Sequence, residues 1–334
     1  MFTHMSTLRY SLTLMRSLSL PVLAIVSLVT AACTGGTAQP TAPTGGGSTP
    51  TTVGSSSTSP APATTTGRPG FCEIGWEPEQ TGMVESAELT EISGAAFSRR
   101  HAGVVWLHND SGSDPAVYAT DTSGADLGRV SLPDLSARDW EDMALGPGPD
   151  PAVDYLYLAD IGDNNRSRDE VQIHRIPEPE PAISVVEGGE TLVITYPLGP
   201  IEAETLLVDP ANGDMVIAGK ALSGVTPLFS LAGDLDWSVP HEATYLGELD
   251  LGTFALATGG DAGANRIVIR TYDEVFAWER SPGSSLAGTL LTQPCRIATV
   301  REEQGEAIAL SIDESEFYTV SEGLNQPILR FAGN

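Results

Sequence analysis

Three glutamates stand at equivalent places in a repeated sequence pattern and could together bind a cation. Glu141 opens "EDMALG", Glu204 opens "ETLLVD" and Glu306 opens "EAIALS", so each acid directly precedes a short apolar run. Carboxylate oxygens suit hard cations, and calcium accepts about six to eight oxygen ligands in loose geometry. We therefore expect Glu141, Glu204 and Glu306 to bind calcium if the fold brings the three repeats together.

The repeat also predicts the fold. Two further copies, "SGAAFS" from Ser93 and "TGGDAG" from Thr258, bring the number to five, with spacings of 48, 63, 54 and 48 residues. β-Branched and aromatic runs such as "GVVWLHND" and "EFYTVSE" follow each copy, bounded by turn residues. About four short strands per period of roughly fifty residues is typical of a β-propeller.

We therefore predict an all-β, five-bladed propeller over residues 71–334, with about four strands in each blade. Residues 72–92 should supply the outer strand of the last blade and close the ring. A six-bladed propeller and a β-sandwich are the alternatives.

A charged residue ends the second strand of every repeat. Because the second strand of a blade runs antiparallel to the first, these residues should lie at the same channel mouth as the three glutamates. They are Asp110, Asp160, Lys220, Arg270 and Glu322. In one interpretation they tie neighbouring blades together through ion pairs and hydrogen bonds. In the other, the glutamates hold calcium and the five charged residues form a pocket for a small anionic ligand; the two interpretations are compatible.

The first seventy residues indicate export and a membrane anchor. Arg9 and Arg16 precede an apolar run of about a dozen residues, which is typical of a signal peptide. Residues 1–32 are therefore predicted to be a lipoprotein-type signal peptide, with Cys33 as the lipidated residue after cleavage. An ordinary cleaved signal with a chance cysteine is the alternative. Residues 33–70 are rich in Thr, Ser, Pro and Gly and predict a disordered tether. We expect a lipid anchor at the outer face of a bacterial cytoplasmic membrane.

The cysteine count and the net charge indicate the compartment of the protein and the kinds of partner it can bind. The chain has three cysteines, and once Cys33 carries lipid, Cys72 and Cys295 are expected to form a disulfide in an oxidising compartment; two unpaired buried thiols are the alternative. Lys and Arg total 17 against 44 Asp and Glu, a net charge of -27, which disfavours binding to nucleic acid. We expect a monomer.

The motifs "EISGAAF", "WEDMALG", "AETLLVD" and "GEAIALSIDESEFYTVSEGLNQPILRF" resemble the five-bladed propellers of the SdiA-regulated family. More distantly they are similar to phytase-type, esterase-like propellers of exported bacterial proteins. The resemblance extends from about Glu88 to Phe331 and implies calcium in or near the channel, carried over to the three glutamates named above. Thr258 replaces the acid in the fourth repeat. The sequence shows no second dense carboxylate cluster, which phosphatase activity would need.

Two functions fit these sequence features. The favoured one is a membrane-tethered extracytoplasmic propeller that contains calcium and binds a small anionic ligand or an envelope protein. The alternative is a calcium-dependent hydrolase of phosphate esters or lactones, in which the metal polarises the substrate. His108, close to the expected mouth, is a candidate base, although a lone histidine there is more often structural.

Overall fold

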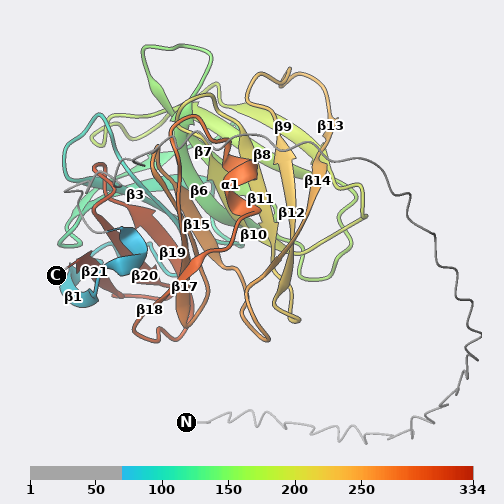
Figure 1. The fold of residues 1–334 in the computed structure, drawn as a ribbon. Coiled ribbons are helices and arrows are strands. Elements are labelled where there is room, and N and C mark those ends of the chain that lie inside the picture. The colour runs from blue at the N-terminus through green and yellow to red at the C-terminus, as the bar shows by residue number, and fades with distance from the viewer. Residues whose placement is uncertain (1–69, 334) are drawn as a thin grey trace, which may run out of the picture. The chain divides into compact units, whose positions relative to one another are not determined.

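The computed structural model describes residues 70–333, which form five antiparallel sheets around a common axis (Figure 1). The protein is therefore a five-bladed β-propeller, as the repeat predicted, and neither a six-bladed propeller nor a β-sandwich. The predicted signal peptide, the tether and Cys33 lie outside the described residues and stay predictions.

The strands follow the chain from blade to blade, each blade beginning at the channel. The first blade contains β2 (Ile92–Phe97), β3 (Val104–Asn109), β4 (Ala116–Asp121) and β5 (Asp126–Ser131). The second contains β6 (Trp140–Pro147), β7 (Asp154–Asp160), β8 (Val171–Pro177) and β9 (Glu190–Thr195). The third contains β10 (Ala203–Val208), β11 (Met215–Gly219), β12 (Val225–Leu231) and β14 (Thr244–Asp250). The fourth contains β15 (Gly259–Ala262), β16 (Arg266–Arg270), β17 (Glu274–Glu279) and β18 (Cys295–Ala298). The fifth contains β19 (Gly305–Leu310), β20 (Glu316–Ser321), β21 (Pro327–Gly333) and β1 (Trp76–Met83).

The hydrophobic core is divided among the gaps between blades. Each of its five clusters joins side chains of two neighbouring blades, so the packing runs completely around the ring. Trp106 and Trp140, for example, are both buried between the first and second blades. Burying a large apolar side chain contributes about 1.5 to 3 kcal/mol, so these gaps hold the blades in place.

The N-terminal strand closes the ring. β1 pairs with β21, so the fifth blade combines the beginning and the end of the described chain, as predicted. A disulfide between Cys72 and Cys295, with Cα atoms 5.7 Å apart, links the segment before β1 to β18 of the fourth blade. The predicted disulfide is thus confirmed, and it closes a loop across 223 residues of sequence.

Two features depart from the simple repeat. β13 (His241–Glu242) leaves the third blade and pairs in parallel with the outer strand β9 of the second. A short α-helix, α1 (Leu286–Leu290), lies between β17 and β18, and the Ser285 hydroxyl accepts a hydrogen bond from the Gly288 N–H at 3.0 Å. None of the helices that the structure describes is long and apolar enough to cross a membrane.

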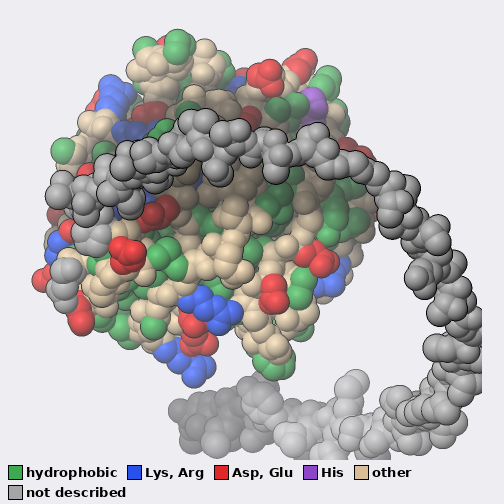
Figure 2. Space-filling view, viewed as in Figure 1, with side chains coloured by type: hydrophobic (Ala, Val, Ile, Leu, Met, Phe, Trp, Pro, Cys, Tyr) green, Lys and Arg blue, Asp and Glu red, His purple; other side chains and the backbone are tan. Residues whose placement is uncertain are grey.

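Charge is spread over the surface rather than gathered in one patch on the face that Figure 2 shows. Acidic and basic side chains are interspersed there with apolar and other polar groups. The charged side chains on this face therefore serve mainly to keep the surface solvated.

Replacing Cys72 and Cys295 together by serine should destabilise the propeller. The bridge restricts a very long loop in the unfolded chain, for which the chain-entropy model gives about 4 to 5 kcal/mol. At about 2 to 4 °C for each kcal/mol in a domain of this size, the thermal midpoint should fall by roughly 8 to 20 °C. Dithiothreitol should lower the midpoint of the unsubstituted protein similarly and leave the double variant unchanged; equal midpoints for the two proteins without reductant would contradict this role.

Candidate functional site

The three predicted glutamates share one backbone position. The pairing register of the innermost strand shifts at Ser93, Glu141, Glu204 and Glu306, so each is the extra residue of a β-bulge. A bulge bends its strand and re-aims the extra side chain. The fourth blade pairs without a shift. The same local distortion therefore presents an acid from three of the five blades at the channel mouth.

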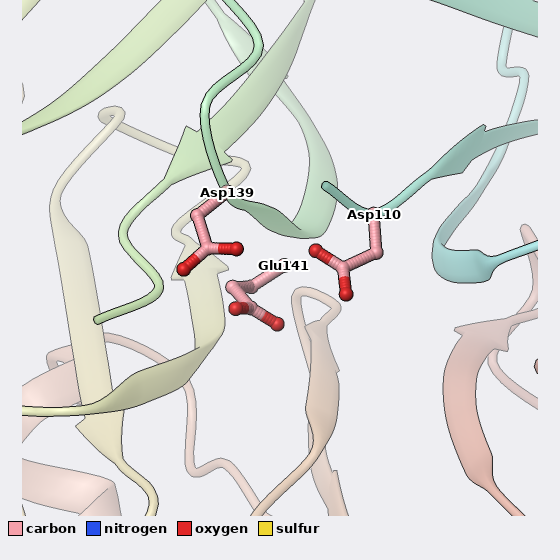
Figure 3. A group of neighbouring side chains, drawn as sticks. All are labelled: Asp110, Asp139 and Glu141. Carbon is pink, nitrogen blue, oxygen red and sulfur yellow. The ribbon is translucent and has the colours of Figure 1, made fainter. Parts of the chain in front are cut away.

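Two groups of carboxylates overlap at this mouth. Oxygens of Glu141, Glu202 and Glu204 lie within 4.8 Å of one another, and so do those of Asp110, Asp139 and Glu141. Figure 3 shows the second group, in which the three carboxylates face one another. Glu141 belongs to both groups. The five acids therefore form one continuous carboxylate cluster.

The cluster differs in membership from the predicted set. The sequence prediction missed Asp139 and Glu202. Each lies two residues before a bulge glutamate, and side chains two residues apart in an extended chain point to the same side. Glu306 belongs to neither close group. It lies close enough to Lys220 and Asp110 for their charges to affect the pKa of its carboxyl group.

Part of the carboxylate cluster already has partners within the protein. The Lys220 ammonium donates to Glu204 Oε1 at 2.5 Å and to the Tyr272 hydroxyl at 3.0 Å. Glu202 Oε2 accepts the Asp163 N–H at 2.8 Å. The other oxygens, Glu202 Oε1 and Glu204 Oε2, are buried and have no hydrogen-bond partner among the described residues. Buried carboxylate oxygens without a partner are costly, so these two atoms mark where a cation would stabilise the fold most.

The electrostatics of the mouth oppose full ionisation. Burial, reinforced by neighbouring carboxylates, raises the pKa of Glu141 well above its ordinary value. Burial likewise raises the pKa of Glu204 well above the ordinary range, against the lowering effect of Lys220. Burial is also the main cause that raises the pKa of Asp110 to about 6, of Glu306 to about 7 and of Glu322 to about 8. Protons or a bound cation must therefore neutralise part of this cluster near neutral pH.

Besides Lys220, whose ammonium pairs with Glu204, two of the predicted ligand-binding residues have fully buried charges that are paired inside the protein. Asp160 forms a buried ion pair with Arg168 at 2.8 Å and accepts the Arg138 N–H at 3.1 Å. Arg270 pairs with Glu302 at 2.6 Å and donates to the Ala307 carbonyl at 2.8 Å. Asp160 and Arg270 thus fit the interpretation in which charges tie the structure together, and a ligand role for them stays a prediction. The half-buried Asp110, Lys220 and Glu322 remain the predicted ligand-binding residues nearest to solvent.

A fully buried acid ties three blades together next to the cluster. Asp142 Oδ2 accepts the N–H of Leu206 in the third blade at 2.9 Å and of Gly260 in the fourth at 3.1 Å. His108 lies nearby with its ring packed edge-on against Trp140, 5.5 Å between centroids. Burial lowers the pKa of His108 to about 4, so its place is structural and it is a poor base for a substrate at the mouth.

Fold and site together define a five-bladed β-propeller with an acidic channel mouth suited to a cation. No model of a known protein family matches the chain, and no curated protein matches its sequence. Solved structures that show a weak likeness include Raptor from Chaetomium thermophilum (12% identity, TM-score 0.41, 78% of this chain and 30% of that one), a nidogen/laminin complex (11%, 0.40, 70% and 73%) and a putative gluconolactonase (12%, 0.40, 80% and 96%). Scores this low carry no argument about family or activity.

The raised pKa values predict that stability falls as pH rises. Between about pH 5 and 8, Glu306 and its neighbours keep protons in the folded state that they lose in the unfolded state, so the free energy of unfolding decreases across this window. With a chelator present, Glu306→Gln should reduce the decrease by about 1 to 3 kcal/mol, at about 1.4 kcal/mol for each pKa unit. Urea unfolding at pH 5.5 and 8 measures this.

The matched control is Glu187→Gln, which removes the same charge from an exposed loop. It should leave the pH dependence as it is in the unsubstituted protein. Identical slopes for Glu306→Gln and the unsubstituted protein would contradict the assignment.

Proposed function

We propose that this protein is a membrane-tethered β-propeller that holds calcium at its channel mouth and uses that face to bind a small anionic ligand or a protein partner. The observation that carries the proposal is the pair of buried, unpartnered oxygens on Glu202 and Glu204 beside Glu141. Membership of the SdiA-regulated or phytase-type propellers belongs to the same proposal.

The donor set favours calcium over softer metals. Every candidate ligand is a carboxylate oxygen, and calcium accepts a larger and less regular set of such ligands than magnesium does. In the buried group, Glu141, Glu202 and Glu204 would hold the ion. Asp110 and Asp139 would complete the acidic surroundings on the more open side.

The backbone also fits closely around this cluster. A Cβ atom added to Gly162 would lie 1.9 Å from Glu141 Oε1 and 2.6 Å from Asp139 Oδ2. Only glycine leaves room for both carboxylates in their present positions. Gly162 therefore offers a way to displace the candidate ligands without changing any charge.

A hydrolase is the second candidate because groups able to transfer protons near neutral pH lie at the same mouth. Asp110 and Glu306, with pKa values of about 6 and 7, are of this kind. A screen of chromogenic esters, phosphate esters and lactones with and without calcium decides between the two functions. If the protein shows calcium-dependent turnover and the Glu204→Gln variant does not, the function is hydrolysis rather than ligand binding.

Calcium should stabilise the folded protein. At about a hundred times its dissociation constant, a ligand that binds only the folded state adds about 2.7 kcal/mol, which corresponds to roughly 5 to 10 °C in thermal midpoint. Glu202→Gln, Glu204→Gln and Gly162→Ala should each weaken this effect, whereas Glu187→Gln should not. The measurement is thermal unfolding with calcium and with chelator, together with elemental analysis. If neither calcium nor chelator changes the thermal midpoint and the purified protein contains no metal, the carboxylate cluster is only part of an ion-pair network between blades.

Replacing Cys33 by serine should release the protein from the membrane fraction. The reason is that the lipid on Cys33, joined to the propeller by the predicted tether, is the proposed anchor. Acyl labelling and fractionation of cells that express each form measure the effect. Unchanged labelling and unchanged sedimentation with membranes would exclude Cys33 as the anchor.

A further inference from the structure

A pocket of about 430 Å³ opens beside the carboxylate cluster, between the second and third blades. Three loops supply its walls: the β7–β8 loop, the segment before β10 and the β11–β12 loop. The residues that matter are Arg166, Ile201, Glu202, Lys220, Leu222 and Pro227. Glu202 and Lys220 link this pocket to the proposed cation site, because both also belong to the mouth described above.

One part of the pocket wall is cationic. Arg166 is exposed, and its guanidinium forms no ion pair with any residue that the structure describes. Its backbone is held in the left-handed region at a φ of 49°, with its N–H bonded to the Asp163 carbonyl at 2.7 Å. Lys220 has three N–H donors and uses two of them, on Glu204 and Tyr272. Both side chains therefore have donors left for an anion.

Besides Glu202 and Ser223, the rest of the wall consists of apolar side chains that are incompletely covered. Leu222 is 71% exposed, although it is a large apolar side chain beside a pocket. Ile201 and Pro227 are half-buried on the same wall. Apolar walls with a few convergent polar groups are typical of small-molecule sites.

We propose that this pocket binds a small organic anion with a short apolar chain. The anionic head would lie against Arg166 and Lys220, and the chain would cover Leu222, Ile201 and Pro227. Arginine suits the head because its planar guanidinium can donate two parallel hydrogen bonds to a carboxylate or phosphate. This ligand class and these residues make the binding function proposed above more specific.

Lys220 couples this pocket to the cation site, and this part rests on the proposed function. At present Lys220 donates to Glu204 Oε1, while Oε2 of the same carboxylate has no partner and would bind calcium. Calcium on this carboxylate would repel the ammonium and weaken its bond to Glu204, which leaves Lys220 free to donate to an anion in the pocket. By thermodynamic linkage, calcium then strengthens anion binding and the anion strengthens calcium binding by the same factor.

Isothermal titration with hexanoate tests the proposal. The full chain carrying Cys33→Ser is the suitable protein, because it has no lipid of its own to bind the probe. Hexanoate should bind to the protein when calcium is present. Acetate lacks the apolar chain and hexanol lacks the charge, so each should bind at least 10-fold more weakly than hexanoate. Arg166→Gln should weaken hexanoate binding about 10-fold or more, and Leu222→Ser should weaken hexanoate while leaving acetate unchanged. The matched control, Arg301→Gln, removes an arginine with an 85% exposed side chain outside the pocket and should have no effect.

The outcomes separate this inference from the cation proposal. Replacing calcium by a chelator should weaken hexanoate binding at least 5-fold. Calcium binding with no hexanoate binding overturns the pocket and leaves the cation site standing. Hexanoate binding that depends on Arg166 in a protein that binds no calcium supports the pocket and overturns the proposed cation. Equal hexanoate affinity with and without bound calcium overturns the coupling through Lys220.

Discussion

The innermost strands of all five blades must converge on one axis, and this convergence forces acidic side chains from different blades together. Glu141 and Glu204 come from strands more than sixty residues apart in sequence, and burial leaves little water to screen their charges. Several features of the structure reduce this repulsion. Lys220 pairs with Glu204, backbone N–H groups bond to Asp142 and Glu202, and the pKa values of the acids rise so that protons are kept. A cation would complete the same neutralisation at the two oxygens that remain without a partner.

The rest of the fold maintains this convergence against its electrostatic cost. Apolar clusters fill every gap between blades, so no blade can move outward without exposing hydrophobic surface. β1 joins β21, and the disulfide from Cys72 to Cys295 holds the closing segment against the fourth blade. Buried ion pairs such as Arg270 with Glu302 and Arg280 with Asp209 fix loops and strands near the ring. The site is thus positioned by the whole ring rather than by one element.

Much of the fold could be predicted from sequence because a propeller repeats in sequence what it repeats in space. The five copies of the apolar run correspond to β2, β6, β10, β15 and β19, and the cysteine count led to the observed disulfide. The excursion of β13 to the second blade and the helix α1 could not be predicted, because each occurs once and breaks the repeat. Strand periodicity also gives no sign of a bulge, so the sequence located Glu141, Glu204 and Glu306 without showing how their backbone is distorted.

The composition of the site was harder to predict than its place. The sequence put Asp160 and Arg270 at the mouth, but it did not show that Arg168 and Glu302, which lie in loops, would pair with them. Asp139 and Glu202 could have been found from their position two residues before the bulge glutamates. The exclusion of Glu306 from the closest carboxylates depends on side-chain distances that no sequence pattern encodes.

Glu141, Glu202 and Glu204 are proposed to hold a cation between them. An anomalous difference map from crystals grown with calcium tests this most directly. We predict one strong peak at about 2.3 to 2.6 Å from oxygens of all three carboxylates, with the Lys220 ammonium moved away from Glu204. A map without a peak between these carboxylates, in which Lys220 still donates to Glu204, would contradict the claim.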